Sequence, residues 1–367
     1  MNADSFAGIV SSAQMIVTCG PGGVGKTSSA AAIGIAAAQA GRNTIVVTVD
    51  PARRLADALG IDIAAHDDEP HEVVGAGLNG GRLSALMLDA EKTFDRMIME
   101  RAGDAARAQK ILDNTVYRSI AGSLAGAQDY MAIERLHQLH TRGGYDLIIV
   151  DTPPSRDAID LLEAPDRLMR FLGHPIYRAL TMPSRSFAKV ANAGTSAFLW
   201  IIRKLAGPKL VEDTIEFFRS LSGMEQGIRQ RAAEVVELLR SDSTAFVVVS
   251  SPREEAAMES GHVVMSLTDR GFGLDALIVN MVHPTPAPLS TATATATATG
   301  TTGPLADLIA FHHDLGVLAA SEAGVIDELL ALAPDVPVAR IPLLDEDVHD
   351  LDALTRLAAL ITGTADH

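Results

Sequence analysis

The stretch MIVTCGPGGVGKT, residues 15–27, joins an apolar run to a glycine-rich turn and a Lys-Thr pair. Its second part, GPGGVGKT, satisfies the pattern G-x-x-x-x-G-K-S/T, and an alanine-rich helical stretch follows it directly. A strand before this motif and a helix after it are the context that a phosphate-binding loop requires. An ordinary glycine-rich turn that opens a helix is the alternative, but it leaves the Lys-Thr pair unexplained. The stretch therefore predicts a nucleotide-binding site.

The predicted loop assigns roles to its residues. Glycines let the backbone wrap closely, so that successive N–H groups point at phosphate oxygens, and the N-terminus of the next helix adds positive potential. Lys26 would reach the β- and γ-phosphates, and the Thr27 hydroxyl would bind Mg²⁺. The expected nucleotide-binding residues are Gly22, Gly23, Val24, Gly25, Lys26, Thr27 and Ser28.

Two aspartates would complete a hydrolytic site. Asp50 follows the apolar run Thr44–Val49, and Asp151 follows Leu147–Val150. Ligands bind at the carboxyl ends of parallel strands, which is the edge where the loop opens. One carboxylate can hold the Mg²⁺ shell while the other positions the attacking water. For Asp50, capping of a short helix that begins near Pro51 is an alternative role.

Short β-rich runs recur along the chain with helical stretches between them. Several runs are apolar without alternation, as expected for strands that helices cover on both faces. This order predicts an α/β fold of the P-loop NTPase type, with a doubly wound, mostly parallel sheet and an inserted α-helical subdomain. The expected strands are Met15–Cys19, Thr44–Val49, Leu83–Leu88, Leu147–Val150, Ala245–Ser250, Leu277–Asn280 and Val336–Ile341.

Two intervals, Asp89–Arg142 and Ser155–Arg240, hold more helical sequence than one crossover between parallel strands needs. In Thr285–Pro304 the low-complexity run STATATATATGTTG predicts a flexible loop. The expected division is an ATPase core over residues 1–88, 143–165 and 243–367, with helical inserts over 89–142 and 166–242.

Composition excludes several classes of protein. The chain has 367 residues, 30 Lys+Arg against 46 Asp+Glu, and a net charge of -16, which argues against a nucleic-acid binder because phosphate affinity needs clustered Lys and Arg. Its single cysteine, Cys19, excludes an intrachain disulfide and a four-thiolate metal site within one chain. No basic signal-peptide region opens the sequence, and its strongest apolar cluster, Ala197–Ile202, is too short to cross a bilayer. We therefore expect a cytoplasmic protein.

The segments GGVGKT, DPARRL, DTPPS, VNMV and IPLLDEDVHDL together resemble the motifs of the arsenite-pump ATPase family, which includes the ATPases of the guided-entry pathway for tail-anchored membrane proteins. The likeness runs from about Met15 to the last helix, and the sequence is most similar to the paired, Get-like members of actinobacteria. It implies a deviant Walker A loop and a dimer that sandwiches ATP at its interface. Such a dimer opens and closes a hydrophobic helical surface as the nucleotide changes.

The resemblance also implies roles for individual residues. Lys26 and Asp50 would be catalytic, with Asp50 polarising water from switch I. Thr27 and Asp151 would bind Mg²⁺, with Asp151 as the switch II carboxylate.

On the base side, Asn280 matches the adenine-reading Asn of the family, and Pro342 and Leu343 match its adenine-side loop. A turn residue that closes a strand is the alternative for Asn280.

Three positions depart from the family pattern. Pro21 replaces a lysine that reaches across the dimer, so the chain would need a lysine-bearing paralogue, or Arg53 or Arg54 would take its place. Cys19 stands alone, without the C-x-x-C pair, which predicts that no zinc is bound and argues against arsenite as a ligand. The switch II glycine is replaced around Ser155–Arg156.

A basic segment stands out within the second helical insert. Arg167–Val211 holds eight Lys or Arg and no Asp or Glu, and it contains the only tryptophan. This composition suits a surface for a hydrophobic client helix or the edge of an anionic membrane. Packing within a helical subdomain, with a solvated basic outer face, is the alternative.

Taken together, these features predict a cytoplasmic, Mg²⁺-dependent ATPase that works as a homodimer or as a heterodimer with a paralogue. One form of this hypothesis also places the protein at the membrane surface as a peripheral protein. Its expected partners are ATP and a hydrophobic client or membrane protein, without nucleic acid. Two alternatives stay open: a regulatory subunit that binds ATP with weak hydrolysis of its own, and a partitioning or positioning ATPase.

Overall fold

The computed structural model describes residues 5–49, 54–61, 68–114, 117, 127–153, 163, 164, 167, 170, 216, 225–289 and 303–364. Several predicted features lie outside these residues. They are Asp50, Arg53, Ser155, Arg156, nearly all of the basic segment and nearly all of the run STATATATATGTTG.

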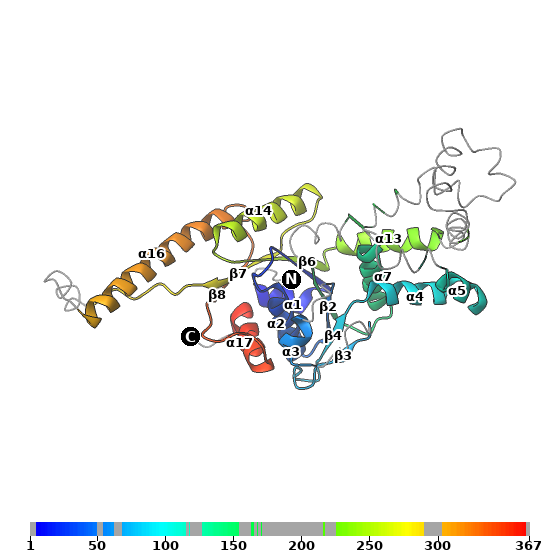
Figure 1. Ribbon diagram of the computed structural model, residues 1–367, viewed down its shortest axis with the longest axis horizontal. Helices are drawn as coiled ribbons and strands as arrows, with labels where there is room; N and C mark the ends of the chain where they lie inside the picture. Colours follow the sequence, from blue (N-terminus) through cyan, green and yellow to red (C-terminus); the bar gives the residue numbers. More distant parts are fainter. Residues whose placement is uncertain are drawn as a thin grey trace.

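A central sheet organises the described part of the chain (Figure 1). Its eight strands lie in the order β3-β4-β2-β5-β1-β6-β7-β8. Neighbouring strands pair in parallel except β3 and β4, which are antiparallel. The predicted fold class is thereby confirmed. The strands are β1 (Met15–Cys19), β2 (Asn43–Thr48), β3 (His71–Glu72), β4 (Arg82–Met87), β5 (Leu147–Asp151), β6 (Thr244–Ser250), β7 (Ala276–Val282) and β8 (Val338–Pro342).

Most expected strands agree with the structure to within about two residues. The last one begins at Val338 rather than Val336, because Pro337 intervenes and has no N–H to donate to a neighbouring strand. The Pro337 carbonyl instead accepts a hydrogen bond from Leu277 N at 3.0 Å. The edge strand β3 was not predicted, since two residues leave no periodic pattern.

Helices cover both faces of the sheet, and alternate strand residues enter different cores. In β1, Ile16 packs into one core, while Met15 and Val17 pack into the other. The first core is covered by α1 (Phe6–Ser12), α2 (Lys26–Gln39), α3 (Arg54–Leu59) and α17 (Leu351–Thr362). The second is covered by α7 (Ala127–Thr141), α13 (Glu225–Leu239), α14 (Glu254–Asp269) and α16 (Pro304–Leu330).

Aspartate side chains begin several helices by accepting hydrogen bonds from otherwise unpaired backbone N–H groups. Asp89 accepts from Lys92 N at 3.0 Å at the start of α4 (Ala90–Arg101). Asp350 accepts from Ala353 N at 2.7 Å and begins α17 directly after the motif IPLLDEDVHD. Local sequence therefore sets these helix starts.

A third cluster joins α7 and α13, which also pack on the sheet, to two further helices. Phe94, Met97 and Ile98 of α4 pack with residues of α5 (Ala105–Leu112), α7 and α13. Inside it, Arg231 Nε donates to the buried Glu134 Oε2 at 2.6 Å, which links α13 to α7. Figure 1 shows these helices on the opposite side of the molecule from the free end of α16. The division into a core and two inserts remains a prediction.

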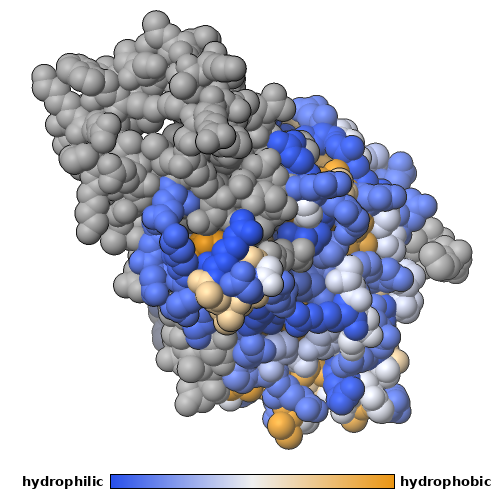
Figure 2. Space-filling view, turned by 90° about the vertical axis from the view of Figure 1, so that its right-hand side faces the viewer, coloured by the Kyte–Doolittle hydropathy of each residue, from blue (hydrophilic) through white to orange (hydrophobic). Residues whose placement is uncertain are grey.

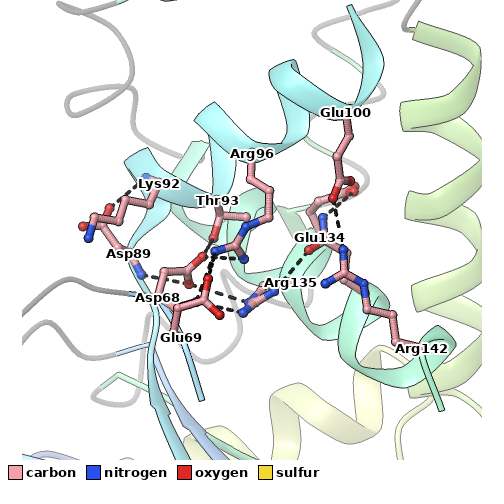
Figure 3. A network of polar contacts seen from close by, with 11 residues as sticks. Asp68, Glu69, Asp89, Lys92, Thr93, Arg96, Glu100, Glu134, Arg135 and Arg142 are labelled. Carbon is pink, nitrogen blue, oxygen red and sulfur yellow. Dashed lines mark hydrogen bonds and ion pairs between the residues drawn. The ribbon is translucent and has the colours of Figure 1, made fainter. Parts of the chain in front are cut away.

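A buried aspartate ties the segment before β3 to this helical cluster (Figure 3). Asp68 is fully buried and has a left-handed φ of 55°, which is uncommon for a residue with a Cβ. Its carboxylate accepts from Thr93 Oγ1 at 2.9 Å and lies 3.1 Å from Arg96 of α4. Arg135 of α7 lies 3.7 Å from the same carboxylate and donates to the Asp68 carbonyl at 2.8 Å. One residue therefore connects two helices to the sheet edge.

Exposed apolar side chains gather on α16. Leu305, Leu308, Phe311, Val317 and Leu318 are each more than 40% exposed, and the helix, which contains no Lys or Arg, projects from the sheet (Figure 1). By contrast, the described residues on the face in Figure 2 are mainly hydrophilic, with small separate apolar patches. α16 begins at Pro304, so the expected flexible loop ends before this helix.

None of the described helices has the length and hydropathy of a membrane span.

Candidate nucleotide-binding site

The loop after β1 has the backbone geometry of a phosphate-binding loop. Gly20 has a φ of 143°, and a Cβ there would lie 2.1 Å from the carbonyl oxygen of Val249 in β6. Gly25 has a φ of 92° and is the N-cap of α2. Glycine is required at both positions, at Gly20 by close approach and at Gly25 by its left-handed conformation. The loop therefore presents its backbone at the N-terminus of a 14-residue helix.

Oxygen and nitrogen groups converge where the loop meets β5. Thr27 Oγ1 donates to Asp151 Oδ2 at 2.8 Å, and Thr48 Oγ1 donates to the same oxygen at 3.0 Å. Lys26 Nζ donates to the Pro21 carbonyl at 2.7 Å and is largely buried. A hydroxyl beside a carboxylate is a donor set that suits Mg²⁺, which prefers oxygen ligands. The predicted pair Thr27 and Asp151 is thus brought together, with Lys26 in the adjacent turn.

The site opens into a cavity of about 470 Å³, which is within the usual size range of a small-ligand pocket. Five of the predicted residues line it: Gly23, Gly25, Lys26, Thr27 and Ser28. Asp50 and Arg53 lie outside the described residues, whereas Arg54 at the start of α3 lines the cavity.

Other predicted residues do not line the cavity in the described structure. Gly22 and Val24 belong to the same loop, and Asn280 contacts that loop from β7. Pro342 ends β8, and Leu343 N donates to the Val282 carbonyl at 2.9 Å.

Several lining residues were missed by sequence reasoning. From α3 these are Asp57 and Ala58, which lie within about one helical turn of Arg54 and so share a face with it. The motif IPLLDEDVHDL contains Val348 and His349, so the resemblance to family motifs could have indicated them. Thr152 lies in the segment DTPPS and Met281 in the segment VNMV, so the same resemblance could have indicated them.

The thiol of Cys19 is buried at the end of β1, just before the loop. Burial raises its pKa to about 12, and a hydrogen bond with Thr152 and the charge of Lys26 oppose this only in part. Because the thiolate is the reactive form, we expect iodoacetamide at about pH 8 to leave the folded chain unlabelled. Intact-mass measurement checks this, with labelling in denaturant as the control. Modification of the folded chain as fast as of an unfolded one would contradict the prediction.

This fold and site define a class of protein. A parallel sheet with a phosphate-binding loop after its central strand, and a carboxylate on the neighbouring strand beside the loop hydroxyl, is the arrangement of a P-loop ATPase.

Comparison with known families refines the class. The chain belongs to the anion-transporting ATPase family, whose model matches residues 13–292, and it is therefore an ATP-binding ATPase. A protein of Aquifex aeolicus whose name places it among the arsenical pump-driving ATPases is 24% identical over 356 residues, which cover 95% of this chain and 79% of the relative. "ATPase GET3" of Malassezia globosa is 24% identical over 92% of this chain and 88% of its own, and "ATPase GET3C" of Arabidopsis thaliana is 26% identical over 72% and 66%.

Proposed function

We propose that this ATPase is Mg²⁺-dependent and that ATP binding and hydrolysis rearrange a dimer, thereby controlling a hydrophobic helical surface for membrane-protein or other apolar clients. The observation that carries the Mg²⁺-dependent hydrolysis is the bond from the Thr27 hydroxyl to the Asp151 carboxylate beside the loop lysine. These groups would hold Mg²⁺, which would neutralise charge on the phosphates during transfer. Lys26 would bind the β- and γ-phosphates, and Asp50 would orient the attacking water.

A physical link between the site and the helical cluster supports the coupling. α3 lines the cavity through Arg54, Asp57 and Ala58, and the chain then continues to Asp68. Asp68 bonds to Arg96 and Arg135 of the helical cluster (Figure 3). The segment that follows α3 in the chain is therefore anchored to α4 and α7, and we propose that a shift of α3 on nucleotide binding acts on them.

The nucleotide base would occupy the side of the cavity lined by Met281, Val348 and His349. Pro342 ends β8 and Leu343 follows it, which supports their proposed place in the adenine-side loop. The family resemblance implies an adenine contact by Asn280, but its amide nitrogen donates to the Val24 carbonyl of the loop.

Assembly with a second chain would complete the site. Exposed apolar side chains along α16 support it, because contiguous apolar patches on a surface mark interaction sites. Pro21 brings no charge to the loop, whereas Arg54 places a guanidinium at the cavity. The second cation would come from Arg54 or from a lysine-bearing paralogue in a heterodimer. Residues 166–242 would form the client surface of a cytoplasmic protein that is peripheral at the membrane.

ATP turnover by the purified chain tests the catalytic part. We expect turnover to require Mg²⁺ and Asp50→Asn to lower it at least about a hundredfold, since a positioned general base contributes that much. Asp242→Asn, at an exposed position, is the matched control. Unchanged turnover of an assembled complex with Asp50→Asn would favour the rival hypothesis of a regulatory subunit whose partner hydrolyses ATP.

Two further measurements address the partners. Mixing with a candidate paralogue should raise turnover if that partner supplies the cation, whereas Arg54→Ala should lower the turnover of the single chain if Arg54 does. Copurification from the native cell, followed by mass spectrometry, should recover proteins with apolar helices. Recovery of DNA-associated or septum proteins instead would favour a partitioning or positioning ATPase.

A further inference from the structure

The side chain of Asn280 contacts the phosphate-binding loop. From β7, its Nδ2 donates to the carbonyl oxygen of Val24 at 3.0 Å. The same nitrogen lies against the next residue of the loop, because a Cβ added to Gly25 would be only 2.4 Å from it. The Asn280 amide therefore lies against the loop backbone at both Val24 and Gly25.

An irregularity in β7 directs Asn280 to the loop and the next residue, Met281, to the cavity. Pairing of β7 with β8 shifts register between Val279 and Val282, and Met281 there has a φ of 61°. A left-handed conformation at a residue with a side chain costs on the order of 1 kcal/mol and persists only where the surroundings enforce it. In this bulge, Met281 lines the cavity, whereas Asn280 reaches the loop from the side.

The contact with Val24 has a consequence for the next amide. The Val24 carbonyl and the Gly25 N–H belong to one planar, trans peptide unit, so they point in opposite directions. Holding the carbonyl on Asn280 therefore directs the Gly25 N–H away from β7. Gly25 lines the cavity, and its position lacks a side-chain cap that could orient the helix start instead.

We propose that Asn280 is a positioning residue for the polyphosphate chain, acting through the orientation of the Val24–Gly25 peptide. The inference rests on the proposed nucleotide site and deepens it. A residue that orients the loop serves every nucleoside triphosphate and inorganic polyphosphate alike. A residue that only reads adenine serves ATP alone.

Binding of inorganic tripolyphosphate separates the two roles, because this probe has no base. We expect Asn280→Ala to weaken Mg²⁺–tripolyphosphate and a non-hydrolysable ATP analogue by the same factor, about two- to tenfold for one hydrogen bond. Isothermal titration calorimetry on the full chain gives both dissociation constants. Asn43→Ala is the matched control. The Asn43 side chain also donates to a backbone carbonyl, that of Gly144, but it lies at the start of β2, away from the carboxyl ends of the strands.

Hydrogen exchange adds a readout that a general loss of stability does not mimic. In the ligand-free chain, Asn280→Ala should speed exchange of a peptide covering residues 20–27 and leave a peptide covering β5 unchanged. Asn280→Ser, which is polar but too short to reach Val24, replaces the alanine variant if that variant fails to fold.

The outcomes are distinct. An unchanged affinity for tripolyphosphate with a weakened affinity for the ATP analogue would overturn the inference in favour of base reading. Failure of the unmodified chain to bind either probe would instead overturn the proposed site itself. Equal weakening of both probes together with local exchange supports the positioning role.

Discussion

Lys26→Met should lower ATP turnover by about a hundred- to a thousandfold, the usual effect of removing one preorganised donor from charge that develops in a transition state. Lys26 is largely buried at the start of α2, so its ammonium acts where water screens it little. Its ammonium donates to the Pro21 carbonyl at 2.7 Å, from where it can turn to a phosphate oxygen.

Folding should be affected far less than activity by this change. Methionine keeps the length of the aliphatic stem, and the folded state loses about 1 kcal/mol for one hydrogen bond. Steady-state turnover and thermal unfolding check the two expectations together. Lys110→Met on α5 is the matched control, because that side chain is 66% exposed. Normal turnover by Lys26→Met would show that the loop is not the catalytic site.

Asp68→Ala should have the largest effect on stability, about 3–5 kcal/mol, because breaking a buried ion pair leaves an uncompensated charge. Burial raises the pKa of Asp68, whereas Arg135, Thr93 and Arg96 lower it. The ionised form of this carboxylate therefore depends on these partners. Removing the carboxylate also takes the ion-pair partner from both Arg96 and Arg135 (Figure 3).

Urea unfolding of the two variants Asp68→Ala and Glu69→Ala measures this difference. Glu69 also pairs with Arg96, at 2.7 Å, but its side chain is 63% exposed, so its loss should cost less than about 1 kcal/mol. Asp68→Asn tolerates the left-handed backbone while losing the charge, which separates backbone strain from charge pairing. Equal effects of the Asp68→Ala and Glu69→Ala variants would contradict a special role of the buried carboxylate.

Which elements could be predicted depends on how local their causes are. β1, the loop and α2 follow from one continuous stretch, because an apolar strand, required glycines and a helix start are each encoded within a few residues. The parallel order of the sheet follows from unbroken apolar strands that alternate with helices. β3 escaped prediction, since its pairing with β4 depends on a partner strand rather than on its own two residues.

The site divides in the same way. Residues of the loop were predicted by number, and the carboxyl-end position of Asp151 indicated that it would lie nearby. Asp57, Ala58 and Met281 were not predicted as lining residues, because a cavity is formed by side chains from segments distant in the chain.

The class of this protein follows from local sequence: glycines that a tight loop requires, a Lys-Thr pair at a helix start and unbroken apolar runs that suit strands covered on both faces. Tertiary structure alone decided which groups meet. Asp151 reaches Thr27 across 124 residues of sequence, Asn280 reaches Val24 across 256, and Asp68 reaches Arg135 across 67. Such contacts depend on strand order and helix packing, and these are properties of the whole sheet that no short segment encodes.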